Sequence, residues 1–92
     1  MSTRHIAYDL EGFSAAAGLE HAGRQALVYL GAAQALRDEI SSPLPPVEQA
    51  ILDRILAPAV ATLSAAERQE ALSQGRNQPL PATIAHALAW SA

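Results

Sequence analysis

Apolar residues recur along the chain at intervals of three and four, the spacing that places them on one face of a helix. The pattern predicts a first helix over about 4–19 and a second over about 24–40. Alternating runs of β-branched or aromatic residues are absent, and the good helix formers alanine, leucine, glutamate and glutamine dominate, so no strand is predicted. The apolar face of the first helix comprises Ile6, Leu10, Phe13 and Ala17, and that of the second Ala26, Tyr29, Leu30, Ala33, Leu36 and Ile40.

The segment from Pro46 to Leu63 is the most apolar of the predicted helices. Its apolar residues cover more than half of the helix circumference, so we expect this helix to be packed on two sides. Pro46 suits the first turn of a helix, whereas Pro58 falls inside it and should kink it. The apolar positions are Val47, Ile51, Leu52, Ile55, Leu56, Val60 and Leu63.

Two short helices follow. Ser64 and Glu67 have the spacing of a capping box, which predicts a helix over about 65–74. Gly75 is expected to end that helix in the left-handed conformation, and a last helix covers about 81–90. The sequence therefore predicts a single all-α domain over 1–92, made of a helical hairpin (4–40) and a three-helix tail (46–90), about five helices in total.

The predicted hairpin has the residue-size pattern of a tetratricopeptide repeat, a unit of about 34 residues. With Ala26 at the conserved small position of the second helix, Leu30 and Ala33 fall at the next packing positions. Phe13 then takes the large position of the first helix, and His21 stands where the turn glycine is usual. Because alanine-rich hairpins often mimic this pattern, it supports a tetratricopeptide-like hairpin without requiring one.

A longer pattern extends this likeness. The chain contains five features in a fixed order: LGAAQALR at 30–37, PLPPVE at 43–48, a long predicted helix, Gly75-Arg76 and a closing predicted helix. The order resembles the C-terminal tail of large bacterial regulators that contain an ATP-binding module and a tetratricopeptide-like sensor region, joined in some to a LuxR-type DNA-binding domain and in others to an adenylate-cyclase-like domain. The resemblance implies a scaffold segment of a signalling or transcriptional regulator, and no active site. This chain departs from the tail at Ser64, usually glycine there, and at Val28 and Val60, commonly polar there.

Composition narrows the range of functions. The chain has no cysteine and no lysine, so a disulfide, a thiolate metal site and a phosphate-binding P-loop are excluded. No run of about 18 uncharged apolar residues is present, and the N-terminus lacks the apolar core of a secretory signal, so we expect a cytoplasmic protein without a membrane partner. Six arginines, dispersed among nine acidic residues, form no phosphate-binding patch, so nucleic acid is not an expected partner.

No residue pattern indicates catalysis, a metal or a cofactor. His5 and Asp9 lie four residues apart, but such a pair is usually a surface hydrogen bond. Gly12-Phe13-Ser14-Ala15-Ala16 lacks the second glycine and the preceding strand of a nucleophile elbow, so Ser14 is better explained as a small residue in a helix contact. The carboxylate pairs, Asp38 with Glu39 and Glu67 with Glu70, fall on polar helix faces. His21 is expected at a turn and His86 in a helix contact.

The remaining hypothesis is a non-enzymatic protein–protein interaction module. We expect the face of the first helix that would meet a preceding repeat to have no neighbour in this chain. Val28 lies opposite the apolar stripe of its helix, so we expect it to be exposed and to support self-association, for example as a homodimer. An alternative is a regulatory domain whose small-molecule effector binds in a pocket lined by Tyr8, Phe13 and Tyr29. The predicted contact residues are Leu10, Phe13, Leu27, Val28 and Val60.

Overall fold

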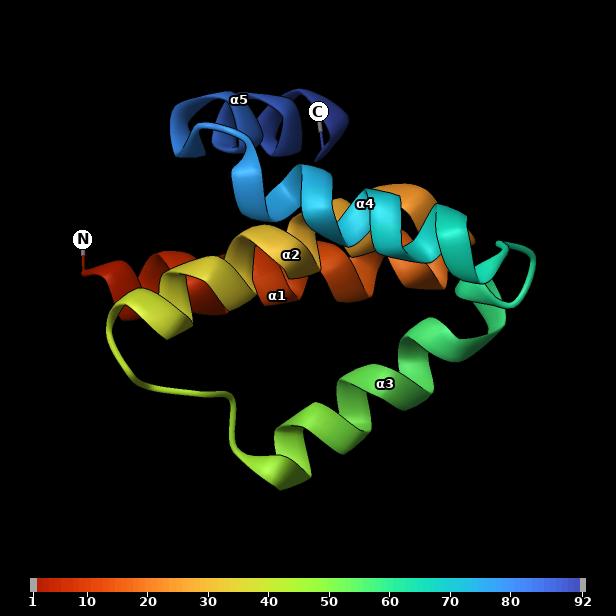
Figure 1. Cartoon of the computed structure of the whole chain (residues 1–92), viewed down its shortest axis with the longest axis horizontal. Helices are drawn as coiled ribbons and strands as arrows, with labels where there is room; N and C mark the ends of the chain where they lie inside the picture. Colours follow the sequence, from red (N-terminus) through yellow and green to blue (C-terminus); the bar gives the residue numbers. More distant parts are fainter. Residues whose placement is uncertain (1, 92) are drawn as a thin grey trace.

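The chain is all-α. A computed structural model describes residues 2–91 and places in them five helices and no strand (Figure 1). The predicted fold class is therefore confirmed, and the first two helices begin and end within one residue of the expected positions. The helices are α1 (Thr3–Leu19), α2 (Gly23–Glu39), α3 (Pro46–Val60), α4 (Ala65–Asn77) and α5 (Leu80–Ser91).

Local hydrogen bonds define several helix ends. The predicted capping box of α4 is confirmed: Ser64 Oγ accepts from the Glu67 N–H at 3.1 Å, and Glu67 Oε1 accepts from the Ser64 N–H at 2.9 Å. The helices α1 and α2 end in left-handed residues, His21 with φ 61° and Ser41 with φ 51°. At each end, the N–H of the left-handed residue and the N–H of the residue after it donate to carbonyl oxygens of the last helical turn. This is the arrangement of a Schellman motif.

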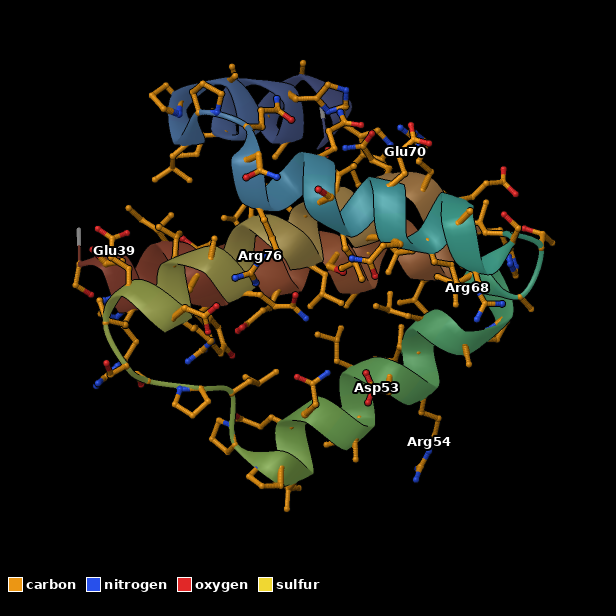
Figure 2. The ribbon with its side chains drawn as sticks, in the orientation of Figure 1. Glu39, Asp53, Arg54, Arg68, Glu70 and Arg76 are labelled. Atoms are coloured by element: carbon orange, nitrogen blue, oxygen red, sulfur yellow. The ribbon has the colours of Figure 1, made fainter. Side chains whose placement is uncertain are left out.

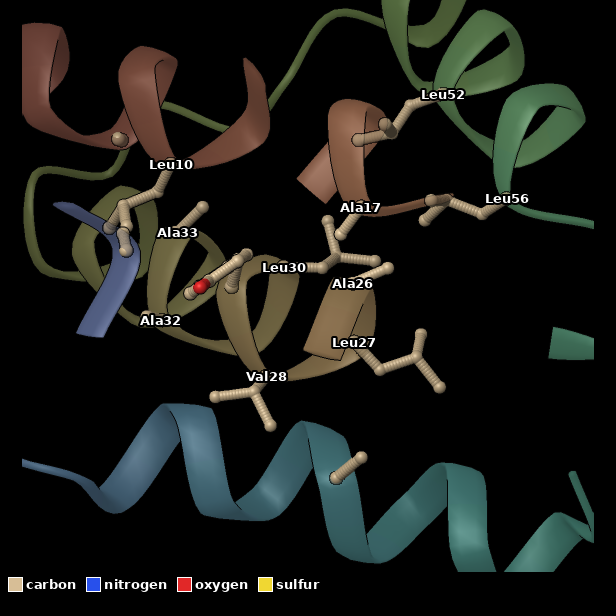
Figure 3. Packing of buried hydrophobic residues seen from close by; sticks show 14 of the residues in the cluster. Leu10, Ala17, Ala26, Leu27, Val28, Leu30, Ala32, Ala33, Leu52 and Leu56 are labelled. Carbon is tan, nitrogen blue, oxygen red and sulfur yellow. The ribbon is translucent and has the colours of Figure 1, made fainter. Parts of the chain in front are cut away.

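The helix α2 is the centre of the molecule. It packs against α1 on one side and α4 on the other, while α3 lies mainly on α1 and α5 lies against α2 (Figure 1). All eight residues from 26 to 33 are buried, so α2 has no exposed face over this stretch. The core is formed chiefly by small and branched aliphatic side chains around α2 (Figure 3).

The prediction that Val28 is exposed is wrong. Its side chain points toward α4 and is only 6% exposed (Figure 3). The helical wheel that placed Val28 opposite the apolar stripe assumed one packed face, whereas α2 is covered on two sides.

The prediction that Gly75 ends α4 in a left-handed conformation is also wrong. The helix α4 continues to Asn77, and no glycine among residues 2–91 has a positive φ. Gly75 is instead buried at the crossing with α2, where a Cβ would overlap the Val28 carbonyl oxygen. Gly31 faces α4 in the same way, because a Cβ there would overlap the Leu72 carbonyl oxygen. Glycines on both helices thus permit the close approach of α2 and α4.

The helix α3 is shorter and less covered than expected. It ends at Val60, and only Leu52, Leu56 and Ala59 are fully buried on it. Val47 is 72% exposed and Ile51 is 52% exposed, so the prediction that this helix is packed on two sides is wrong for the chain alone. Pro58 lies inside the helix, as expected.

Candidate functional site

The five predicted contact residues do not share a surface. Leu10, Leu27 and Val28 are buried in the core, at 2%, 6% and 6% exposure. Phe13 and Val60 are partly buried and pack against that core. A partner of the folded chain can therefore reach Phe13 and Val60, whereas Leu27 and Val28 serve the internal packing.

Two of these residues line a groove between α1 and α5. Its volume is about 210 Å³, and Leu10 and Phe13 form part of its α1 wall. The Phe13 ring also contacts the Tyr29 ring, with centroids 6.0 Å apart. Asp9 is the one charged residue among those lining this groove, which are otherwise Ile6, Leu10, Phe13, Ile84, Ala87 and Leu88.

Four of the exposed large apolar side chains among the described residues lie on α1 and α3, and a fifth, Leu88 of α5, is 59% exposed. Tyr8 and Leu19 of α1 are 64% and 69% exposed, and Val47 and Ile51 of α3 are exposed as described above. We call these four residues the α1/α3 face. Tyr8 and Ile51 line a groove of about 240 Å³ between the two helices. Two features of the sequence indicated this face: the side of the first helix that was expected to lack a neighbour, and the wide apolar arc of the third helix. Neither feature identified Tyr8, Leu19, Val47 or Ile51 as contact residues.

A buried ion pair lies beside this face, and the sequence did not reveal it. Arg37 donates from Nε to Glu11 Oε2 at 2.5 Å and from a terminal nitrogen to Glu11 Oε1 at 2.8 Å. Its other terminal nitrogen donates to the Ser42 carbonyl at 3.1 Å. The hydrogen bond to Glu11 raises the pKa of Arg37 above its ordinary value. The pair therefore joins α1, α2 and the segment leading to α3.

Two of the other candidate acids form exposed ion pairs between α2 and α4. Arg76 pairs with Asp38 at 2.6 Å, and Arg24 pairs with Glu70 at 3.3 Å. Figure 2 shows Arg54 pointing outward from α3 and Arg68 and Arg76 on α4, so the charges are spread over different helices. In the part of the chain that the structure describes, no three histidine or acidic side chains come close enough to hold a metal ion.

The histidines differ in their surroundings. His5 Nδ1 lies 2.8 Å from Ser2 Oγ, at the start of α1. His21 is exposed at the turn after α1. His86 makes the expected contact between helices, because its Nδ1 lies 3.1 Å from the Tyr29 hydroxyl.

The expected effector pocket does not form from Tyr8, Phe13 and Tyr29 together. Tyr8 lines the groove beside α3, Phe13 lines the groove beside α5, and Tyr29 is fully buried. Tyr29 is a core residue whose ring is covered by Phe13, His86 and Trp90. Burial raises its pKa above the ordinary value, with an opposing hydrogen bond from Gln25.

None of the helices within residues 2–91 has the length and apolar character needed to cross a membrane. Comparison of the chain with protein-family models, with curated proteins and with solved structures finds no match. The described residues form an all-α domain with exposed apolar side chains on α1, α3 and α5.

Proposed function

We propose that the chain is a non-enzymatic protein–protein interaction module whose contact surface is the α1/α3 face. The observation that carries the proposal is the exposure of four large apolar side chains, Tyr8, Leu19, Val47 and Ile51, on two neighbouring helices. Tyr8 and Ile51 line one groove between these helices, and exposed apolar side chains brought together in this way are typical of a surface that another chain covers.

The shape of this face suits a helical partner. Tyr8, Gly12 and Leu19 fall on one side of α1, and a Cβ on Gly12 would meet no other atom within 4 Å. A partner backbone can therefore approach α1 closely at Gly12, with its apolar side chains directed into the groove beside Ile51. Recognition of this type uses the apolar face of an amphipathic helix.

The proposal includes a tetratricopeptide-like origin, as in the C-terminal part of the sensor region of a cytoplasmic bacterial signalling regulator. Three features support it. The helices α1 and α2 form a closely packed hairpin, and Ser14 Oγ donates to the Ala26 carbonyl at 2.7 Å where small residues are expected. His21, at the position of the usual turn glycine, has the left-handed conformation that glycine favours. In such an array, a preceding repeat would cover the exposed side of α1.

Self-association tests the contact surface directly. We expect the sedimentation coefficient of the chain to rise with concentration, and Ile51→Glu to abolish the rise because it places a charge in the contact. Gln69→Glu is the matched control, since it adds the same charge on the exposed side of α4. A chain that stays monomeric at all concentrations, with no concentration-dependent NMR shifts in α1 or α3, contradicts self-association through this face. Val28→Arg is not a suitable probe, because Val28 is buried.

A second candidate function is the binding of a small effector in the groove between α1 and α5. The favouring observation is that this groove is lined by apolar side chains with Asp9 as the one charged member. An apolar amine matches that chemistry. We expect phenethylamine to raise the melting temperature, phenylpropionate to have no effect, and Asp9→Asn to remove the difference. Equal effects of both compounds would contradict this function.

A further inference from the structure

Polar side chains take part in the contact of α5 with α2 and α4. Tyr29 of α2 is fully buried, and its hydroxyl lies 3.1 Å from His86 Nδ1 of α5. Gln25 Nε2, also on α2, lies 3.2 Å from the same nitrogen. These contacts join α2 to α5. His86 is 57 residues along the chain from Tyr29 and 61 residues from Gln25.

Two further polar atoms in this contact have no protein partner. Gln78 Oε1, at the end of α4, and Thr83 Oγ1, in α5, are buried and make no hydrogen bond within the described residues. Thr83 is only 1% exposed. Both residues line one cavity of about 40 Å³, together with Gln25, Tyr29 and His86. A buried polar atom without a hydrogen bond is destabilising, so two of them at one cavity indicate a ligand.

The chemistry of the cavity defines that ligand. The ligand must donate a hydrogen bond, because the Gln78 carbonyl oxygen only accepts, and it must be polar at a second point to satisfy the Thr83 hydroxyl. The lining side chains are amides, hydroxyls, one valine and one imidazole, so no carboxylate is present to hold a cation. The volume is enough to hold a water molecule.

We propose that one water molecule is bound between α2, α4 and α5, where it donates to Gln78 Oε1 and accepts from the Thr83 hydroxyl. The water completes the hydrogen bonding of the α5 contact. It also positions Ile84 and Ala87, which follow Thr83 on α5 and line the groove toward α1. The site is thus a structural water that holds one wall of that groove.

Thr83→Val tests the proposal by the sign of its effect. Valine keeps the shape of threonine and removes the hydroxyl. If a water uses that hydroxyl, the variant loses a hydrogen bond, and its unfolding equilibrium constant rises about fivefold. If the hydroxyl is merely unsatisfied, the variant is more stable than the wild type, which overturns the proposal. Thr83→Ser is the matched control, because it keeps the hydroxyl and should keep the water.

A double-mutant cycle tests whether Gln78 and Thr83 share one ligand. Gln78→Met removes the carbonyl oxygen with little change in length. We expect its effect and that of Thr83→Val to be strongly non-additive, because either substitution already disrupts the shared water. Strictly additive effects overturn the proposal.

The water can also be observed in the unmodified chain. Magnetic relaxation dispersion of solvent nuclei counts long-lived waters, and NMR cross-relaxation places them next to assigned amides. We expect a long-lived water near the Thr83 amide of the wild type, retained in Thr83→Ser and lost in Thr83→Val. No long-lived water near Thr83 in the wild type overturns the proposal even if a variant fails to fold.

Discussion

At the scale of single residues, Glu11 and Arg37 form a buried ion pair in which each charge depends on the other for compensation. Both side chains are about one-tenth exposed, and all three donor groups of Arg37 that face the protein are used. Removal of one partner leaves a buried charge without compensation, which costs about 3–5 kcal/mol. Since a domain of this kind is stable by about 5–15 kcal/mol, one substitution here removes a large share of the total.

We therefore expect Glu11→Ala to lower the free energy of unfolding by about 3–5 kcal/mol, and Glu11→Met combined with Arg37→Met to cost much less. The double variant replaces both charges with apolar groups of similar length, so no buried charge remains. Urea denaturation followed by circular dichroism measures both. A double variant less stable than Glu11→Ala would show that the pair acts through the Ser42 carbonyl contact or through packing, not through charge compensation.

The left-handed residues at the ends of α1 and α2 are a second residue-scale feature. Neither His21 nor Ser41 is glycine, and the left-handed conformation costs a residue with a Cβ about 1–2 kcal/mol. Glycine removes this cost but adds freedom to the unfolded chain. We expect His21→Gly and Ser41→Gly each to stabilise the fold by about 0.5–1 kcal/mol, measured by thermal denaturation. Ser42→Gly is the control, because Ser42 has no positive φ, and it should give no gain.

The capping box gives a pH dependence of defined sign. The Ser64 N–H, and then the Ser64 hydroxyl, lower the pKa of Glu67 below its ordinary value of 4.5. The ionised carboxylate therefore contributes stability above pH 4.5, and this contribution is lost as the pH falls through the lower pKa of the folded state. We expect the melting temperatures of wild type and Glu67→Gln to differ above pH 4.5 and to converge as the pH falls below the lowered pKa of Glu67 in the folded state. Glu70→Gln, outside the box on the same helix, controls for the loss of one surface charge together with its exposed ion pair to Arg24.

At the scale of helices, the crossing of α2 and α4 depends on glycine. A Cβ on Gly75 or Gly31 would overlap a backbone carbonyl of the facing helix, and backbone cannot move aside as a side chain can. We expect Gly75→Ala and Gly31→Ala each to cost about 3 kcal/mol or more. Gly12→Ala, on the open side of α1, should instead gain about 0.5–1 kcal/mol from helix propensity. Equal effects of Gly75→Ala and Gly12→Ala in urea denaturation would contradict the crossing.

The sequence could predict interactions within one helix, but it could not predict contacts between helices. The capping box of Ser64 and Glu67 was predictable because both partners lie within one helical turn. The roles of Gly75 and Val28 were not, because they depend on α4 packing against α2, and no local pattern specifies which helices meet. The Glu11–Arg37 pair joins residues 26 positions apart, and each looked like an ordinary surface charge.

The candidate contact surface shows the same limit. The wide apolar arc of α3 was visible in the sequence, and it indicated two packed sides. The sequence could not show that α1 covers only the side with Leu52 and Leu56, which leaves Val47 and Ile51 exposed. An apolar arc therefore predicts that a surface will be covered, without indicating which chain covers it.

At the scale of the whole molecule, the chain is as compact as a self-sufficient domain of its length. Its radius of gyration is 12.0 Å, and the value usual for this length is about 12 Å. Its accessible surface is 5372 Å², against about 5,100 Å² for a folded monomer of this mass. The exposed α1/α3 face therefore belongs to a compact unit.

Compactness does not imply uniform stability, because α5 is attached less extensively than α1 and α4 are. Its main contacts are the Tyr29 ring against His86 and Trp90, and the polar cavity beside Thr83. Local unfolding begins where the fewest buried contacts hold an element. Trp90 is the one tryptophan in the sequence, so its fluorescence reports the position of α5 alone, whereas circular dichroism reports all helices.

We expect the fluorescence transition in urea to precede the circular dichroism transition, because α5 detaches before the α1/α2/α4 core unfolds. Ala85→Gly, on the exposed side of α5, lowers the helix propensity by about 1 kcal/mol and should move the fluorescence transition further toward low urea while the core transition stays in place. Gln69→Gly makes a comparable change on the exposed side of α4 and should move the core transition instead. Coincident transitions in the wild type and in both variants would mean that α5 is an integral part of one cooperative unit, since every perturbation would then be shared by the whole chain.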